Sequence, residues 1–269
     1  MVDGVAPAGA PLFHRLRGRG PVVVLLNGVS MTLSAWESVA TLLEGRYRVL
    51  RCDFRGQLRS PGPPPATLEG HARDLLALLD HLGLERVHLV GASFGAAVAR
   101  RAVTLEPERA LSLTCATAAA GRTATLERAA RRWLAAARAV LAGGDPGAVF
   151  DAFEPWVYSP RYLEEHPRHR QVFRAQVATL PRRWFVGLAT LLECVLADDE
   201  RAVTRAPCPA LVIAAGADRL VAVEEAAELA TGLGAAFEII PGAGHALAIE
   251  HPAACARACL GFLDRLGSR

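Results

Sequence analysis

Residues 87–95 read VHLVGASFG, and this stretch decides the fold. Its first four residues form the apolar run of a buried parallel strand, and the small, apolar residues from Phe94 onward are typical of a helix. Gly91, Ser93 and Gly95 match the Gly-x-Ser-x-Gly pattern, in which a serine lies on a very tight strand-to-helix turn. Larger side chains at the two glycines would collide across that turn. In this context the pattern predicts that Ser93 is a nucleophile rather than an ordinary turn residue.

On both sides of this turn, short apolar runs alternate with amphipathic helical stretches. Strands are expected at Leu12–Arg17, Val22–Leu26, Tyr47–Cys52, Val87–Gly91, Leu111–Cys115, Ala210–Ala215 and Phe237–Ile240, with Leu12–Arg17 as an edge strand. Helices are expected at Ala35–Leu43, Leu68–Leu82, Phe94–Leu105, Val223–Thr231 and Ala253–Leu266. The alternation predicts an α/β protein with a mostly parallel central sheet flanked by helices.

The middle of the chain does not show this alternation of strands and helices. Helices are expected there at Leu126–Leu141, Val172–Leu180 and Trp184–Leu196. Breaks between helices are expected at Gly143–Gly144, Pro155, Pro160, Pro167 and Pro181. Because no strand is expected in this segment, we predict a core made of residues 1–121 and 207–269, with a helical cap (lid) inserted at residues 122–206.

A serine nucleophile needs a base, and the base needs an acid to orient it. The chain has eight histidines. His245 lies in a Gly-rich loop directly after the last expected strand, where a base can reach a nucleophile at the carboxyl edge of the sheet. His251 is better explained as the residue that starts the following helix. We therefore predict that His245 is the base.

The acid is expected one strand earlier. Asp218 follows the strand Ala210–Ala215, in the chain order Ser, acid, His that is expected on this fold. The alternative is that Asp218 only caps the next turn, as Asp often does. Glu224 and Glu225 fit better in the first turn of the next helix, so Asp218 is the predicted acid.

Further stretches resemble the α/β-hydrolase superfamily, and the likeness extends over nearly the whole chain. Asn27–Trp36 resembles the oxyanion-loop segment of that superfamily, where a His-Gly dipeptide is usual and a Trp follows at similar spacing. Asn27 replaces the His, and this variant is similar to the Ser-Asn-Ser loop of 3-oxoadipate enol-lactonase-like hydrolases. Pro241–Pro252 matches the histidine loop of the superfamily and the helix after it.

The stretch Cys52–Ser60 resembles the superfamily's Asp-x-Arg-Gly-His-Gly-x-Ser segment. It departs from that segment at Gln57 and Leu58, which replace the His and the second Gly. We expect Asp53 and Arg55 to brace the loop rather than to touch a substrate.

The resemblance implies an α/β-hydrolase fold and an oxyanion hole made by the backbone N–H groups of Phe94 and Val29. Loop support is expected from Asn27, Gly28, Gly91 and Gly95. For Asn27 two interpretations are equally open: its side chain orients the loop by hydrogen bonds, or it is a simple turn residue at the end of a strand.

The reaction that these residues predict is cofactor-free hydrolysis of a carboxylic ester, lactone or thioester through an acyl-enzyme on Ser93. Serine at this position disfavours haloalkane dehalogenases and epoxide hydrolases, which use Asp. Carbon–carbon bond hydrolysis, perhydrolysis, and biosynthetic acyl transfer or cyclisation remain open. A ligand receptor that retains the triad is the alternative from a different class.

Composition narrows the possible partners. The 269 residues include 30 basic residues, all arginine, and 27 acidic residues, for a net charge of +3. The absence of Lys excludes a P-loop lysine and a pyridoxal phosphate Schiff base. The small charge and scattered arginines indicate no nucleic-acid surface, and the six cysteines lack metal-ligand spacing. We expect no cofactor, metal or membrane partner and a cytoplasmic location, since the N-terminus lacks a signal-peptide layout. Nothing in the sequence indicates the oligomeric state.

The charge is unevenly placed. Residues 122–206 contain 13 arginines and 10 acidic residues, so the whole net charge of +3 falls in the expected cap. These arginines either lie on solvated helix faces, or some face inward and favour a substrate with a carboxylate or phosphate.

Overall fold

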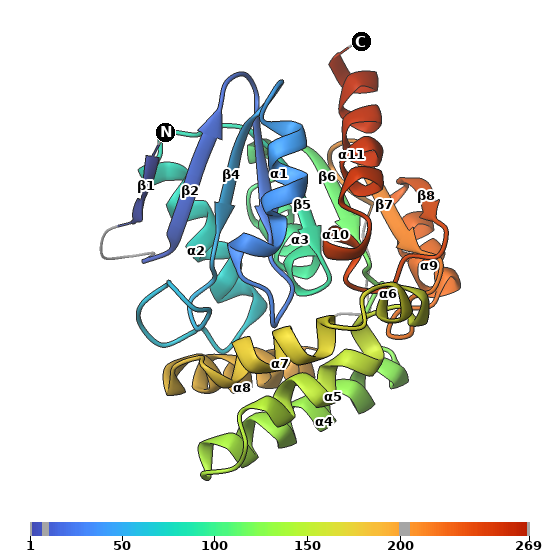
Figure 1. Cartoon of the computed structure of the whole chain (residues 1–269). Coiled ribbons are helices and arrows are strands. Elements are labelled where there is room, and N and C mark those ends of the chain that lie inside the picture. The colour runs from blue at the N-terminus through green and yellow to red at the C-terminus, as the bar shows by residue number, and fades with distance from the viewer. Residues whose placement is uncertain (1, 7–10, 199–204, 268–269) are drawn as a thin grey trace.

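The centre of the molecule is a twisted sheet. The computed structural model describes residues 2–6, 11–198 and 205–267, and within them eight strands pair in the order β1-β2-β4-β3-β5-β6-β7-β8 (Figure 1). The strands are β1 (Val2–Val5), β2 (Phe13–Gly18), β3 (Val22–Leu26), β4 (Arg48–Cys52), β5 (Val87–Ala92), β6 (Ala110–Ala116), β7 (Ala210–Ala215) and β8 (Ala236–Ile240). Strand β2 pairs antiparallel with β1 and β4, and the other neighbours are parallel. The predicted mostly parallel sheet is confirmed. The expectation that Leu12–Arg17 is an edge strand is wrong, because β2 pairs on both sides and the unpredicted β1 forms the edge.

Both faces of the sheet are covered, which explains why its inner strands are apolar throughout. Val24 and Leu26 of β3 belong to the core on one face, and Val23 and Leu25 belong to the core on the other. The first core includes residues of α2 (Leu68–His81), α3 (Phe94–Leu105) and α9 (Val223–Leu233). The second includes residues of α1 (Glu37–Leu43), α10 (Leu247–Glu250) and α11 (Pro252–Gly267). Short 3-10 helices occupy Leu33–Trp36 (η1) and Pro107–Arg109 (η2).

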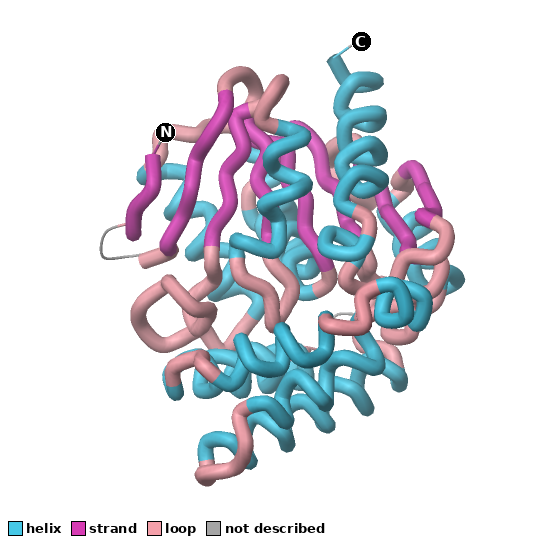
Figure 2. Tube along the Cα trace, viewed as in Figure 1, coloured by secondary structure: helices cyan, strands magenta, loops and turns pink. Residues whose placement is uncertain are grey.

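A layer of helices lies across the carboxyl ends of the strands (Figure 2). This helical layer consists of α4 (Ala124–Leu141), α5 (Gly147–Val157), α6 (Pro160–Glu165), α7 (His169–Ala178) and α8 (Arg182–Ala197). Helices α4, α7 and α8 correspond to the expected helices, whereas α5 and α6 were not expected. None of the described helices is long and apolar enough to cross a membrane.

The expectation that Pro155 breaks the chain between helices is wrong. Pro155 lies inside α5, two residues before the helix ends at Val157, and it is exposed. A proline there removes one late backbone hydrogen bond, and the buried side chains of Phe150 and Phe153 hold the helix together nevertheless. Pro160 is the first residue of α6, where a missing N–H group is harmless.

The helical layer is packed directly on the core. Leu220 of the core belongs to the same apolar cluster as Trp184 and Leu188 of α8, and Val29 and Leu58 pack against this cluster. Helix α8 also crosses the loop after β4 with backbone against backbone. A Cβ atom on Gly187 would lie 1.9 Å from the carbonyl oxygen of Gly56, so only glycine permits this crossing.

Candidate functional site

Ser93 lies on the turn between β5 and α3, as predicted. Its backbone has φ 51° and ψ −114°, a positive φ that among the described non-glycine residues only Thr117 shares. Such a conformation costs about 1–3 kcal/mol and must be held by its surroundings. The N–H of Ser93 donates to the carbonyl of Ala116 at 2.9 Å, which ties the turn to the end of β6.

The glycines on either side of Ser93 are required by close backbone contacts. A Cβ atom on Gly91 would lie 2.3 Å from the carbonyl oxygen of Gly95. A Cβ atom on Gly95 would lie 2.3 Å from the carbonyl oxygen of Leu26 at the end of β3. Any other residue at either position would force the turn open.

Asp218 and His245 are directly joined. Nδ1 of His245 lies 2.8 Å from Oδ2 of Asp218, and their side chains are only 9% and 1% exposed. The other carboxylate oxygen, Oδ1, accepts from the N–H groups of Leu220 at 2.8 Å and Val221 at 3.0 Å. Asp218 therefore caps its turn with one oxygen and orients the histidine with the other. The sequence left open whether Asp218 is a turn cap or the acid that holds the histidine, and its two oxygens make both kinds of contact.

The sheet topology places the three residues at the same edge of the sheet. Ser93 follows β5, Asp218 follows β7 and His245 follows β8, and these strands run parallel within one half of the sheet. A carboxylate only accepts hydrogen bonds, so Nδ1 of His245 carries its proton and Nε2 of the neutral ring offers a lone pair. His251 starts α11 by accepting the hydrogen bond of Cys255, as expected.

The loop that carries His245 is held by hydrogen bonds on both sides of the histidine. Before it, the N–H of Gly244 donates to Oε2 of Glu250 at 3.1 Å. After it, the N–H of Ala246 donates to the carbonyl of Val157, at the end of α5, at 2.7 Å. The second bond crosses from the core to the helical layer.

Glu250 makes a further connection to that layer. Its carboxylate accepts from the backbone N–H of Ser159 at 3.1 Å and from the Ser159 hydroxyl at 2.6 Å. Ser159 is buried and caps the start of α6. We call the contacts of Gly244, Ala246 and Glu250 with Val157 and Ser159 the base joint. In the sequence Glu250 is marked only as part of the Pro241–Pro252 stretch, and no pattern points to this contact.

Two backbone N–H groups are expected to bind an oxyanion, and they belong to the turns after β5 and β3. Phe94 is the first residue of α3, so its N–H has no acceptor within the helix. Val29 is in the turn after β3, where the N–H of Met31 donates to the carbonyl of Gly28 at 3.1 Å. Within the described residues, the N–H of Val29 has no hydrogen-bond acceptor.

A buried polar network supports this turn. Nδ2 of Asn27 lies 3.0 Å from the carbonyl of Cys52, 3.2 Å from Oδ1 of Asp53 and 2.9 Å from Oε1 of Gln57. Nε2 of Gln57 donates to the carbonyl of Gly28 at 2.9 Å. Burial raises the pKa of Asp53, and hydrogen bonds from backbone N–H groups and from Asn27 oppose that rise.

Other residues that the sequence singled out form ion pairs or caps that stabilise loops and helices. Arg55 forms a two-pronged ion pair with Asp74 at 2.6 and 2.8 Å, away from Ser93. Glu225 accepts from the N–H of Ala222 in the first turn of α9, as expected. Thr117, the other residue with positive φ, is buried at the end of β6, and no sequence pattern pointed to it.

The ion-paired arginines of the helical layer are exposed except for Arg122, whose side chain is 19% exposed and donates to the carbonyl of Leu196, and the carboxylate of Glu154 is buried. Exposed arginines that pair with an acidic residue of the same layer include Arg131, Arg138, Arg161 and Arg170. Their partners are Glu127, Glu193, Glu165 and Glu154. These positions favour the solvated-face interpretation of the cap arginines. Arg201 lies outside the described residues.

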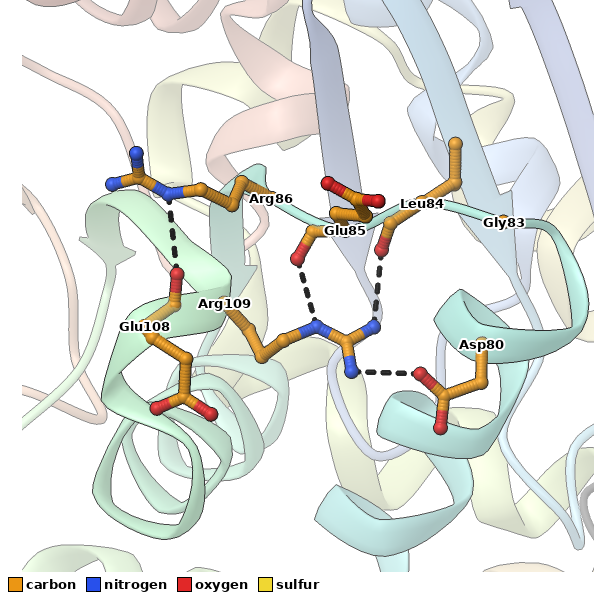
Figure 3. Close-up of a pocket in the computed structure, with 7 residues that line it drawn as sticks. All are labelled: Asp80, Gly83, Leu84, Glu85, Arg86, Glu108 and Arg109. Carbon is orange, nitrogen blue, oxygen red and sulfur yellow. Dashed lines mark hydrogen bonds and ion pairs between the residues drawn. The ribbon is translucent and has the colours of Figure 1, made fainter.

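A surface pocket of 610 Å³ lies at the far end of the molecule, where α2 ends, β5 begins and η2 lies (Figure 3). Arg109 crosses it and donates to the carbonyls of Leu84 and Glu85 and to the carboxylate of Asp80. Because these groups occupy the guanidinium, the pocket offers little to a ligand. Among the described residues, no group of three or more His, Cys, Asp or Glu side chains is arranged to hold a metal ion.

Comparison with known proteins gives consistent likenesses. The model of the alpha/beta hydrolase family matches residues 23–258. A protein of Variovorax paradoxus named "Putative carbamate hydrolase RutD" is 29% identical over 268 residues, covering 96% of this chain and 98% of that protein. The 3-oxoadipate enol-lactonase 1 of Acinetobacter baylyi is 26% identical, covering 91% and 90%. The crystal structure of an enol-lactonase from Burkholderia xenovorans superposes with a TM-score of 0.84 at 26% identity, covering 97% and 99%.

Proposed function

The chain belongs to the α/β-hydrolase family, and from this premise we propose that it is a serine hydrolase that cleaves a carboxylic ester, lactone or thioester. The observation that carries the proposal is the 2.8 Å hydrogen bond between Asp218 and His245, at the sheet edge where Ser93 lies on its strained turn. A relative named as an enol-lactonase supports ester-type chemistry.

The mechanism follows from the roles that each group can take. Nε2 of His245 accepts the hydroxyl proton of Ser93 while Oγ attacks the substrate carbonyl. Asp218 keeps the Nδ1 proton in place and stabilises the imidazolium that forms. The tetrahedral oxyanion is held by the N–H groups of Phe94 and Val29. His245 then gives its proton to the leaving group, which departs and leaves the acyl group on Ser93.

Deacylation repeats these steps with water. Nε2 of His245 accepts a proton from a water molecule, whose oxygen attacks the acyl carbonyl. The second tetrahedral intermediate collapses, the carboxylic acid departs and the proton returns to Oγ of Ser93. Neither half-reaction requires a redox change or a group that the chain lacks.

In this proposal the helical layer is a cap that shapes the substrate site. The apolar cluster of the layer reaches Val29, Leu58 and Leu220, which are close in sequence to the proposed oxyanion and acid residues. The exposed arginines Arg131, Arg138, Arg161 and Arg170 pair with acidic residues of the layer itself. We therefore expect the acyl group of the substrate to be apolar and uncharged.

That expectation has a direct test. A neutral nitrophenyl butyrate and its carboxylate analogue, nitrophenyl hemisuccinate, differ in one charge at nearly equal size. At low salt the neutral ester should have a kcat/KM at least about tenfold higher, because an apolar wall does not compensate the desolvation of a carboxylate. Equal or faster hydrolysis of the anionic ester would contradict the apolar assignment and favour the inward-facing arginines.

Carbamate hydrolysis is a second candidate, favoured by a relative whose name includes that activity and which spans 96% of this chain. The same groups serve it, since a carbamate carbonyl can be attacked by Ser93 and its oxyanion held in the same way. A carbamate therefore belongs in the substrate panel.

The test of the proposed function compares the wild type with Ser93→Ala on nitrophenyl esters, lactones, acyl thioesters and a carbamate. We expect steady multiple turnover on at least one ester-type substrate, and a loss of several orders of magnitude in Ser93→Ala. Hydrolysis that is unaffected in Ser93→Ala would show that the mechanism is wrong. A single slow turnover followed by tight ligand binding would favour a receptor instead.

A further inference from the structure

Gln57 lies in the loop after β4, where the family resemblance leads one to expect a histidine. Its side chain is buried, with the residue only 3% exposed, and both ends of its amide are used. Oε1 accepts from the N–H of Phe54 at 2.9 Å and from Nδ2 of Asn27 at 2.9 Å. Nε2 donates to the carbonyl oxygen of Gly28 at 2.9 Å.

The neighbouring groups determine which way this amide points. Nδ2 of Asn27 also faces the carbonyl of Cys52 and the carboxylate of Asp53, which are both acceptors. The Asn27 group must therefore be the donor, and the atom of Gln57 that meets it must be the oxygen. The NH₂ group of Gln57 then has to face Gly28.

The carbonyl of Gly28 and the N–H of Val29 belong to the same peptide unit. A trans peptide is planar, with its C=O and N–H pointing in opposite directions. No peptide bond among the described residues is cis. Two donors, Nε2 of Gln57 and the N–H of Met31, hold the Gly28 oxygen on one side. The N–H of Val29 must therefore point to the other side, away from Gln57.

We infer that Gln57 is a positioning residue that aims the N–H of Val29 at the oxyanion formed on Ser93. This inference rests on the proposed function, because it concerns the oxyanion hole of that same site. The hydrogen bond from Gln57 also polarises the peptide, which makes the N–H of Val29 a stronger donor. Gln57 touches neither substrate nor Ser93 in this account; it acts through the peptide.

The decisive variant is Gln57→Glu. When ionised, its side chain has nearly the same shape and can still accept from Phe54 and Asn27, but it places an oxygen against the carbonyl of Gly28 and cannot donate to it, so the kinetics are measured as a pH profile that extends to the pH where this buried carboxyl is ionised. Gln57→His supplies one ring N–H donor and one ring acceptor. It should therefore retain more activity than Gln57→Glu. Ser112→Ala is the control, because Ser112 is equally buried and bonded to His88 but lies far along β6 from the site.

The readouts are kcat and KM for an ester substrate, and the affinity for a trifluoromethyl ketone, whose adduct with Ser93 carries an oxyanion. Removing one oxyanion donor lowers kcat about 10²–10³-fold. A donor that is only displaced from its correct direction should lower kcat by no more than this. For Gln57→Glu we expect kcat to fall toward this bound, KM to change less than about threefold, and ketone affinity to fall in parallel with kcat/KM. Thermal unfolding of all variants reports whether they fold.

The outcomes separate this inference from the proposed function. If Ser93→Ala is inactive while Gln57→Glu keeps the wild-type kcat and ketone affinity, the role of Gln57 is overturned and the proposed function stands. If Ser93→Ala remains active, the proposed function itself fails. If Gln57→Glu does not fold, Gln57→Met, which removes the donor to the carbonyl of Gly28 without adding a charge, decides: a fall in kcat and ketone affinity without a change in KM supports the role, and unchanged values overturn it.

Discussion

The two sides of Ser93 are held in different ways. On the oxyanion side, the turn of Gly28 and Val29 is supported by Asn27 and Gln57, which are buried residues of the core. On the base side, His245 is held by the base joint, whose contacts cross to the helical layer. The hydrogen bonds that hold the oxyanion side therefore lie within the core, whereas those that hold the base side cross to the layer above it.

This difference teaches where the site is open to change. Movement or redesign of the helical layer disturbs the histidine loop first, because the N–H of Ala246 and the carboxylate of Glu250 have their partners in α5 and α6. The oxyanion side meets the layer by packing at Val29, Leu58 and Gly56 and has its hydrogen bonds within the core, so the same change should disturb it less. Variants that alter only the oxyanion side or only the base side test whether the two sides are held independently.

The largest effect is expected at Asp218. In Asp218→Asn the amide can no longer stabilise the imidazolium or select the Nδ1-protonated form of His245, so kcat should fall about 10⁴-fold. Affinity for a neutral substrate analogue should hardly change. Steady-state kinetics on a nitrophenyl ester measures the effect. Asp80→Asn, at the far pocket, is the matched control, and a fall of less than tenfold in Asp218→Asn would contradict the assigned role.

The next effect concerns the free energy of unfolding of the protein, which depends on a buried histidine next to the oxyanion side. His71 is buried against Phe54 and Phe94, with ring centroids 5.6 and 5.3 Å apart, and burial lowers its pKa to about 4 from the usual 6.5. Between these values the unfolded chain binds a proton that the folded chain does not, so stability falls as the pH decreases through that window. The loss from this group approaches about 3 kcal/mol near pH 4.

Urea unfolding at several pH values between 7 and 4 measures this loss. His71→Leu should flatten the decline, because the group that titrates is removed. The exposed His81, at the end of the same helix, offers a control in His81→Gln, which should follow the wild type. If His71→Leu lost stability with acid as steeply as the wild type, the buried histidine would not be the source.

A smaller effect is expected from the base joint. Glu250→Gln keeps the shape of the side chain but turns one acceptor toward Ser159 or Gly244 into a donor, so a charged hydrogen bond is lost. Because such bonds contribute about 1.5–3 kcal/mol, kcat should fall by about tenfold to a hundredfold, with ketone affinity and KM less affected. Glu225→Gln, at the start of α9, is the matched control. An unchanged kcat in Glu250→Gln would show that the layer does not hold the base.

Much of this arrangement could be predicted from local sequence signals. Strand β3 falls at Val22–Leu26 as predicted, because a short, wholly apolar run suits only a buried strand. The turn at Ser93 was predictable because its glycines are demanded by backbone contacts a few residues away. Helix α5 was missed because Pro155 resembles a chain break until the packing of its buried side is known.

The supporting contacts could not be predicted for a different reason. Gln57 and Gly28 are 29 residues apart, and Ser159 and Glu250 are 91 residues apart. No periodicity or spacing records such a contact, because it exists only after the loops of separate strands meet. The departure of Gln57 from the family pattern was visible, but its hydrogen bonds were not.

The most direct test of the central claim is covalent labelling of Ser93. A fluorophosphonate reacts with a serine only where a base activates it and an oxyanion site binds the product. Intact-protein and peptide mass spectrometry, followed during inactivation, should find one label per chain, located on Ser93, with activity lost in proportion to labelling. Label on another residue, or full activity in the chain labelled at Ser93, would contradict the account.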